Sequence, residues 1–341
     1  MLKQMLLGAA ALGMMELASA QSNVSVYGIM DAGIARESGL AAGDKKWSVM
    51  SGMSQGSRLG FRGTEDLGGG LSALYRLEAG ILLDTGLSAQ NGVLFGRAAF
   101  VGLQNQLGAL TIGRQYTPMD TYLAFIDPYN NNSAGKAINV FNRGYAVRMD
   151  NAVVFKSAKY KGFYTHLAYG FGEVADDASK LRGFGGAIYY DVGRVHIGAA
   201  LQSSNTQTTA TVPVQGNVRN TAVGAMYDFG FVKMTLAVGA SKTTVGAART
   251  ADARSSQIAF EAPYGAHTFI TNFAYRDDQL PANNDANQFS LGYRYALSKR
   301  TTLYSTWARI DNRNKATYAD NSTAEAGSGD RAFNLGIRHN F

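Results

Sequence analysis

Apolar and polar residues alternate along most of the chain with a period of two, not with the 3.6-residue period of a helix. From position 71 to 81 the apolar side chains hold the odd positions, whereas the even positions include Arg76 and Glu78. The same alternation recurs at 269–276 and at 289–295. Each of these segments is therefore predicted to be a β-strand with one apolar and one mostly polar face.

Turn-forming residues separate the predicted strands, and short connections alternate with long ones. The short connections include 65–70, 228–230 and 297–300, and the long ones include 176–180, 203–216, 277–286 and 312–330. A barrel that spans a membrane has tight turns at one rim and longer loops at the other. The chain is long enough for sixteen membrane strands of ~9–11 residues with their connections. No linker or break in composition interrupts the pattern, which predicts one domain.

Alternation alone does not separate a membrane barrel from a soluble β-sandwich or a β-helix, because a sandwich also has one buried and one wet face. Two features favour the barrel. Aromatic residues recur near predicted strand ends, as at Tyr189 and Tyr190 and at Tyr293 and Tyr295, which is typical of girdles at membrane interfaces. The last apolar face also continues to the terminal Phe341, whereas the ends of soluble domains usually fray.

The first twenty residues have the pattern of a secretory signal peptide. Lys3 gives the positive start, an apolar run follows from Met5 to Met15, and Ala18 and Ala20 provide the small residues before a cleavage site. A helix that stays attached is the alternative, but this run is too short to span a bilayer. We therefore expect a signal peptide at 1–20 and a barrel domain at 21–341.

Composition narrows the possible chemistry. The chain has no cysteine, so disulfides and thiolate metal sites are excluded. The formal net charge of +7 is compatible with nucleic acid, anionic lipid or anionic solutes as partners. Export makes nucleic acid the least favoured of the three, and no nucleic-acid partner is predicted.

No catalytic, metal or cofactor site is predicted. The four histidines stand apart without ligand spacing, and the glycine clusters match neither a P-loop nor a dinucleotide fingerprint. Two other function classes stay open at this point. An outer-membrane barrel enzyme would need serine, histidine and acid residues that converge at one rim. A soluble or surface-attached β-rich binding protein would share the alternation.

Five stretches carry a resemblance to a known family. They are 25–31, 56–70, 95–103, 110–116 and 336–341. On these residues the chain resembles the general porins of β-proteobacteria, which include anion-selective trimeric porins and neisserial porins. The resemblance implies an all-β, sixteen-stranded antiparallel transmembrane β-barrel in the outer membrane of a Gram-negative bacterium. It also implies a third loop folded into the lumen, at about 117–144. The implied partners are outer-membrane lipid and lipopolysaccharide, two further copies in a homotrimer, and a barrel-assembly machinery that reads the terminal Phe341.

The same resemblance implies a pore constriction where basic wall residues face carboxylates. By motif, the arginines fall on Arg58, Arg97 and Arg148, and the wall carboxylate falls on Glu78. For the acid of the loop we choose Asp127, with Asp120 second.

A physical argument extends the basic lining beyond the family motif. An arginine at mid-depth on the lipid face costs ~2–4 kcal/mol, so arginines within alternating strands should point into water. This predicts lumenal positions for Arg62, Arg76, Arg276, Arg294 and Arg309. Clustered arginines would concentrate small anions in a passive channel, although each one could also simply solvate the lumen or pair with an acid such as Glu78.

Aromatic residues are frequent in and beside the expected loop, at Tyr116, Tyr122, Phe125 and Tyr129. They could guide solutes by stacking, but anchoring the loop against the barrel wall is the simpler role.

Overall fold

The computed structural model describes residues 23–41, 43–207, 214–320, 323, 325–327 and 329–341. The predicted signal peptide lies outside the described residues. Seventeen β-strands occur in the described part of the chain, and each is antiparallel to the strands that it pairs with. They are β1 (Asn23–Leu40), β2 (Gly43–Ser51), β3 (Arg58–Gly68), β4 (Leu71–Gly80), β5 (Ala98–Asn105), β6 (Gly108–Tyr116), β7 (Arg148–Ser157), β8 (Phe163–Gly170), β9 (Gly183–Val192), β10 (Val195–Gln207), β11 (Gln215–Asp228), β12 (Lys233–Val245), β13 (Ala248–Tyr264), β14 (His267–Asp278), β15 (Ala286–Ala296), β16 (Thr301–Asn312) and β17 (Gly329–Asn340).

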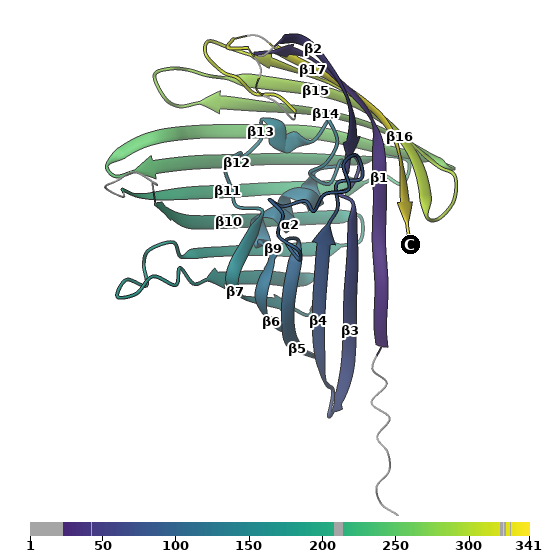
Figure 1. Cartoon of the computed structure of the whole chain (residues 1–341), viewed down its shortest axis with the longest axis vertical. Helices are drawn as coiled ribbons and strands as arrows, with labels where there is room; N and C mark the ends of the chain where they lie inside the picture. Colours follow the sequence, from purple (N-terminus) through teal and green to yellow (C-terminus); the bar gives the residue numbers. More distant parts are fainter. Residues whose placement is uncertain (1–22, 42, 208–213, 321–322, 324, 328) are drawn as a thin grey trace, which may run out of the picture.

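The sheet closes on itself, because β17 pairs with β1 along ten residues (Figure 1). One barrel position is shared by two strands. β2 pairs with the second half of β1, from Ala32 to Leu40, and β3 pairs with its first half, from Asn23 to Ile29. The seventeen strands therefore fill sixteen positions, and the predicted sixteen-stranded antiparallel barrel is confirmed.

Between β2 and β3, residues 52–57 leave the wall and are held by a buried carboxylate. Asp31 accepts hydrogen bonds from the backbone N–H groups of Ser54 and Gln55, at 3.0 and 2.7 Å, and from the hydroxyl of Tyr304. These bonds satisfy main-chain donors that the interrupted strand cannot pair.

The two faces of the sheet differ as the alternation predicts. Large apolar side chains such as Val101, Ile112 and Val238 are 58–60% exposed on the outside, between inward residues that are small or polar. A soluble sandwich would bury such rows, so that alternative is wrong here. Exposed aromatics such as Tyr160 and Tyr264 lie beside short connections, consistent with an interfacial girdle.

Tyr189 does not belong to that girdle, so our prediction that it lies at the membrane interface is wrong. It is buried on the inner face, where its ring stacks on Tyr164 at a centroid distance of 4.6 Å. The neighbour Tyr190 alone faces outward and packs on Phe163. Adjacent residues of a strand cannot share a face, so only one of the two tyrosines could meet lipid.

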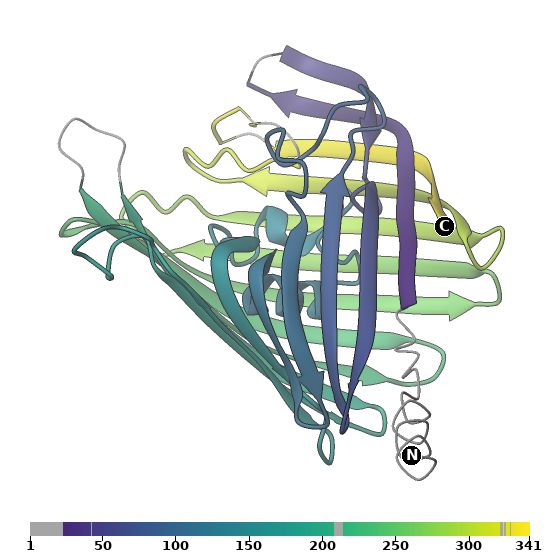
Figure 2. The ribbon, with the colours of Figure 1, turned by 60° about the horizontal axis from the view of Figure 1, so that its bottom comes forward.

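Residues 117–147 connect β6 to β7 and fold inside the ring of strands (Figures 1 and 2). They contain α2 (Pro118–Ile126) and a single 3₁₀ turn at Ala137–Asn139. Thr117 caps α2, since its hydroxyl accepts from the Asp120 N–H, and Pro118 occupies the first turn where no N–H is needed. Asp127 ends the helix.

Within this loop, α2 packs on one side of the barrel, against β8 to β12. The inner face of that wall is built from small residues, among them Gly198, Ala200, Ala222 and Ala237, which leave room for the side chain of Tyr122. The Tyr122 hydroxyl donates to the Gly198 carbonyl at 2.6 Å. Within the described residues, no helix is both long and apolar enough to cross a membrane.

A charge on the outer face should destabilise the barrel. We expect Val238→Arg, near the middle of β12, to lower the free energy of unfolding in phospholipid vesicles by about 2–4 kcal/mol, because the guanidinium would face hydrocarbon. Guanidinium chloride titration would measure it, with Val238→Leu as the apolar control. Equal unfolding free energies for the two variants would contradict a lipid-facing position.

Candidate pore constriction

A buried carboxylate organises the basic wall formed by β3 to β7. Glu78 on β4 is fully buried, and its two oxygens interact with four side chains, three through hydrogen bonds and Arg58 through an ion pair. Arg97 donates through Nε at 2.8 Å, Arg58 lies at 3.7 Å, and both approach Oε1. Arg76 and the hydroxyl of Tyr27, at 2.7 Å, share Oε2. One carboxylate therefore holds three arginines side by side against their mutual repulsion.

Strand register brings these residues together. Tyr27, Gly60 and Glu78 lie on one row across β1, β3 and β4. A Cβ atom at Gly60 would come within 2.4 Å of the Tyr27 ring, so only glycine lets that ring lie over β3 and reach Glu78. The ring in turn supports Arg62 and Arg76, whose guanidinium carbons lie 5.0 and 5.4 Å from its centroid.

Arg148, at the start of β7, is fixed without an ion-pair partner among the described residues. It donates from Nη2 to the Tyr116 hydroxyl at 2.7 Å and from Nε to the Arg97 carbonyl at 3.2 Å. Its guanidinium carbon lies 4.4 Å from the centroid of the Tyr116 ring, and that of Arg97 lies 5.8 Å away. Tyr116 therefore works as a platform for two arginines.

An acid on the loop faces this wall, and it is Asp120 rather than Asp127. Asp120 accepts from the Tyr145 hydroxyl at 2.9 Å and interacts electrostatically with Arg148 and Arg97. Burial raises the pKa of Asp120 to about 6, against the opposing effects of the Tyr145 hydrogen bond and of Arg148. Asp120, our second choice from the sequence, is thus better placed than Asp127 to face the arginine wall.

Asp127 is placed elsewhere, so our first choice for the acid of the loop is corrected. Its carboxylate is buried and accepts the backbone N–H groups of Tyr129, Asn131 and Ala137, at 3.0, 3.1 and 3.2 Å. Burial raises its pKa to about 6 as well. Three backbone donors occupy this carboxylate, so Asp127 closes the loop on itself.

The other predicted lumenal arginines divide into two groups. Arg62, Arg76, Arg276 and Arg294 occupy inward positions of their strands, and Arg294 donates to the Pro128 carbonyl at 2.6 Å, which ties the loop to β15. Arg309 is the exception.

Arg309 lies on the outer face of β16 with Leu303 and Trp307, and it pairs with Asp311 at 2.7 Å. Its predicted lumenal position is wrong. The cost of an outward arginine falls near the end of a strand, where lipid headgroups replace hydrocarbon.

The aromatic residues of the loop mainly anchor the loop against the barrel wall. Tyr122 and Tyr129 are buried against the wall, and Phe125 packs on Tyr189 edge to face at 5.6 Å. The residues that the sequence analysis did not single out are Tyr27, Asp31, Tyr304 and Arg338. The sequence could have shown that Arg338 points inward, because it lies on the polar face of the last strand. Its Nη1 lies 3.4 Å from the Ser54 hydroxyl. The described part of the chain contains no cluster of three or more histidine or acidic side chains that could hold a metal ion.

Comparison with known proteins decides the family. A family model described as Gram-negative porin matches residues 8–315. The chain belongs to the Gram-negative porin family. An outer membrane porin protein of Bordetella pertussis is 32% identical, and outer membrane porin protein 32 of Delftia acidovorans is 29% identical, each over the full length of both chains. This porin is therefore an outer-membrane protein, and the family points to a channel rather than an enzyme.

Solved structures support the same fold. The anion-selective porin from Comamonas acidovorans superposes with a TM-score of 0.82 at 28% identity, covering 94% of this chain and all of that one. A loop-deletion form of OmpT of Vibrio cholerae gives a TM-score of 0.74 at 15% identity, covering 94% of this chain and 99% of the other, and it supports the fold alone.

Removal of the central carboxylate should destabilise this porin. We expect Glu78→Gln to lower the free energy of unfolding by about 3 kcal/mol, because three arginines and Tyr27 lose a buried anionic partner. Glu261→Gln is the control, since Glu261 is partly exposed and 3.8 Å from Arg294, and it should cost under about 1 kcal/mol. Similar losses for both variants would contradict the central role of Glu78.

Proposed function

We propose that this porin is a passive diffusion channel whose constriction prefers small anions. The observation that carries the proposal is the charge of one wall, where Arg58, Arg76 and Arg97 surround a single carboxylate, Glu78, and Arg148 lies beside Arg97. Four positive charges and one negative charge leave a formal excess of three. Because the barrel wall is a poor dielectric, this excess raises the local concentration of anions in the passage.

The loop gives the passage its asymmetry. It is bonded to the opposite wall through contacts such as Ser133 to Thr306 and Asn139 to Gln288, at 2.7 and 2.9 Å. Solutes would then pass between the arginine wall and Asp120, across a transverse field. Arginine suits this role because it stays charged and offers a planar fork to carboxylate or phosphate. Binding at such a point must remain weak for solutes to leave again. The Comamonas relative, named anion-selective, supports this proposal.

We also propose that the mature chain begins after the signal peptide and assembles as a homotrimer. For Phe341, we propose that the assembly machinery reads it before the barrel closes. In support, Phe341 exchanges two backbone hydrogen bonds with Gly28, at 3.0 and 3.1 Å, so it takes part in the joint between the first and last strands.

Neutralising Arg148 should weaken anion preference. We expect Arg148→Gln to lower the anion-to-cation permeability ratio about tenfold, since a unit charge about 6 Å from a passing ion is worth ~0.7 kcal/mol in water and acts with opposite sign on an anion and on a cation. Reversal potentials under a salt gradient in planar bilayers would measure the ratio. Arg309→Gln, on the outer face, is the matched control. The proposal fails if the wild type prefers cations, or if both variants change the ratio equally.

Selectivity should also depend on pH through Asp120. With a pKa of about 6, its carboxylate is charged at pH 7 and mostly neutral at pH 5. Loss of this negative charge beside Arg148 should raise the anion-to-cation permeability ratio as the pH falls. In Asp120→Asn the ratio should be high at pH 7 already and nearly independent of pH. A full pH response in that variant would assign the effect to another acid.

A further inference from the structure

A polar pocket lies beside the loop of residues 117–147, away from the arginine wall. Its volume is about 230 Å³, and its lining comes from β11, β12, β13 and β15 and from loop residues that include Phe125 and Pro128. Sites for drug-sized ligands measure ~300–1,000 Å³. This pocket therefore suits a small molecule.

The pocket lies on the periplasmic side of that loop. Lys233 is the first residue of β12, and Glu261 and Arg294 come shortly before the ends of β13 and β15. Each of these strand ends adjoins a short connection, and short connections occupy the periplasmic rim of such barrels. All three side chains hold inward positions of their strands. A solute that has passed the arginine wall would meet this pocket before it reaches the periplasm.

Two basic and two acidic side chains line the pocket, so its formal charges cancel. The bases are Lys233 and Arg294, and the acids are Glu261 and Asp127. Three backbone N–H groups occupy the Asp127 carboxylate, and Arg294 donates to the Pro128 carbonyl at 2.6 Å. Lys233 and Glu261 therefore remain available to a ligand.

Lys233 and Glu261 face each other without forming a close pair. They are directly opposite in the register of β12 and β13, where Cβ atoms are about 5 Å apart. Even so, among the residues that the structure describes, the Lys233 side chain has no hydrogen bond or ion pair. In the same part of the chain, the Glu261 carboxylate pairs with Arg294 alone, at 3.8 Å, which is too long for a hydrogen bond. One ammonium group and one carboxylate thus lie beside the same small space, free to bind.

These two groups select for the charge pattern of a ligand. A simple anion would be attracted by Lys233 but repelled by Glu261, and a simple cation would meet the reverse. A molecule that carries an ammonium group and a carboxylate close together satisfies both residues at once, through charge-assisted hydrogen bonds. An α-amino acid has this pattern. Phe125 and Met226 add apolar surface to the lining, which favours an amino acid with an apolar side chain.

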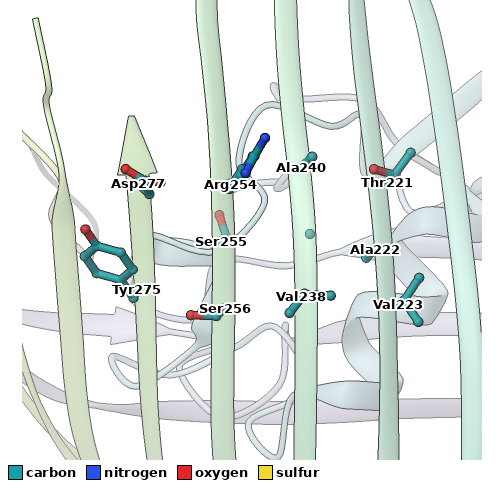
Figure 3. A pocket seen from close by; sticks show the side chains of 11 residues that line it. Thr221, Ala222, Val223, Val238, Ala240, Arg254, Ser255, Ser256, Tyr275 and Asp277 are labelled. Carbon is teal, nitrogen blue, oxygen red and sulfur yellow. The ribbon is translucent and has the colours of Figure 1, made fainter. Parts of the chain in front are cut away.

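A larger depression on the outer face shows that two opposite charges alone do not make such a site. It spans β11 to β14, has a volume of about 490 Å³ and is drawn in Figure 3. Arg254 and Asp277 line it and are likewise opposite each other in the strand register. This depression faces the membrane, where a zwitterion would lose its hydration. The pocket of Lys233 and Glu261 faces the water of the lumen.

We propose that this pocket binds a zwitterionic α-amino acid with an apolar side chain on its way through the channel. Lys233 binds the carboxylate of the ligand, Glu261 binds its ammonium group, and Arg294 holds the loop in place beside them. Binding has to remain weak for the solute to leave again. Such a ligand has no net charge at neutral pH, so this binding does not depend on the proposed anion preference.

The test compares three ligands that share one apolar side chain. L-Leucine carries both charges, isocaproate lacks the ammonium group, and isoamylamine lacks the carboxylate. Their binding to the whole barrel, folded in deuterated detergent, is measured at pH 7 by saturation-transfer difference NMR. We expect isocaproate and isoamylamine each to bind the wild type at least about fivefold more weakly than L-leucine, because each lacks one of the two charge-assisted contacts.

Two variants assign the roles of the charged residues. Lys233→Gln and Glu261→Gln should each weaken L-leucine binding about fivefold. Glu261→Gln should also bind isocaproate more tightly than the wild type does, since the repelling carboxylate is gone. Lys233→Gln should do the same for isoamylamine. A purely structural role of either residue would instead weaken the binding of all three ligands together.

The matched control is Lys156→Gln, because Lys156 alternates in step with the inward Ala152 and Val154 on β7 and lies outside the pocket. This variant should bind L-leucine like the wild type. Equal weakening by Lys156→Gln and Lys233→Gln overturns the proposal. So does an absence of saturation transfer to L-leucine in the wild type, or isocaproate binding as tight as that of L-leucine. Reversal potentials test the anion preference separately, so the two proposals can fail independently.

Discussion

The structure depends on one constraint, that hydrocarbon offers no hydrogen-bond partner to a polypeptide backbone. Every N–H and C=O group within the membrane must then be paired inside the sheet, and only a closed sheet has no free edge. The β1–β17 joint supplies that closure. Where the wall is interrupted, at residues 52–57, the chain turns inward and the buried Asp31 replaces the missing strand partner. The alternation of side chains follows from the same closure, since one face meets lipid and the other meets the lumen.

Inside the barrel, residue size decides where the loop lies and therefore where the passage runs. Small residues on β10 to β12 receive α2, and the bulk of the loop fills that side. The arginines come from β3 to β7 and the segment that precedes β5, on the opposite side. They remain close together because Glu78 and the rings of Tyr27 and Tyr116 hold them. A single carboxylate gives a rigid basic wall while cancelling only part of its charge.

Much of this architecture could be read from the sequence. The period of two, the alternation of short and long connections and the terminal Phe341 predicted a membrane barrel. Family motifs placed Arg58, Arg97, Arg148 and Glu78 on one wall. The division of one barrel position between β2 and β3 could not be predicted, because it depends on Asp31 meeting Ser54 and Tyr304 across strands far apart in the chain.

The loop and the rim show where the sequence stops being informative. The sequence put Asp127 before Asp120 as the acid of the loop, and only the irregular fold of the loop turns Asp120 toward Arg148 and Asp127 toward three backbone N–H groups. Arg309 lies two residues from Trp307 on β16, so alternation places both side chains on the same, outward face. Local pattern determined which residues share a face, because strand geometry is local. Which face meets water at a given height, and which charges meet, was decided by closure and register, because these join residues distant in the chain.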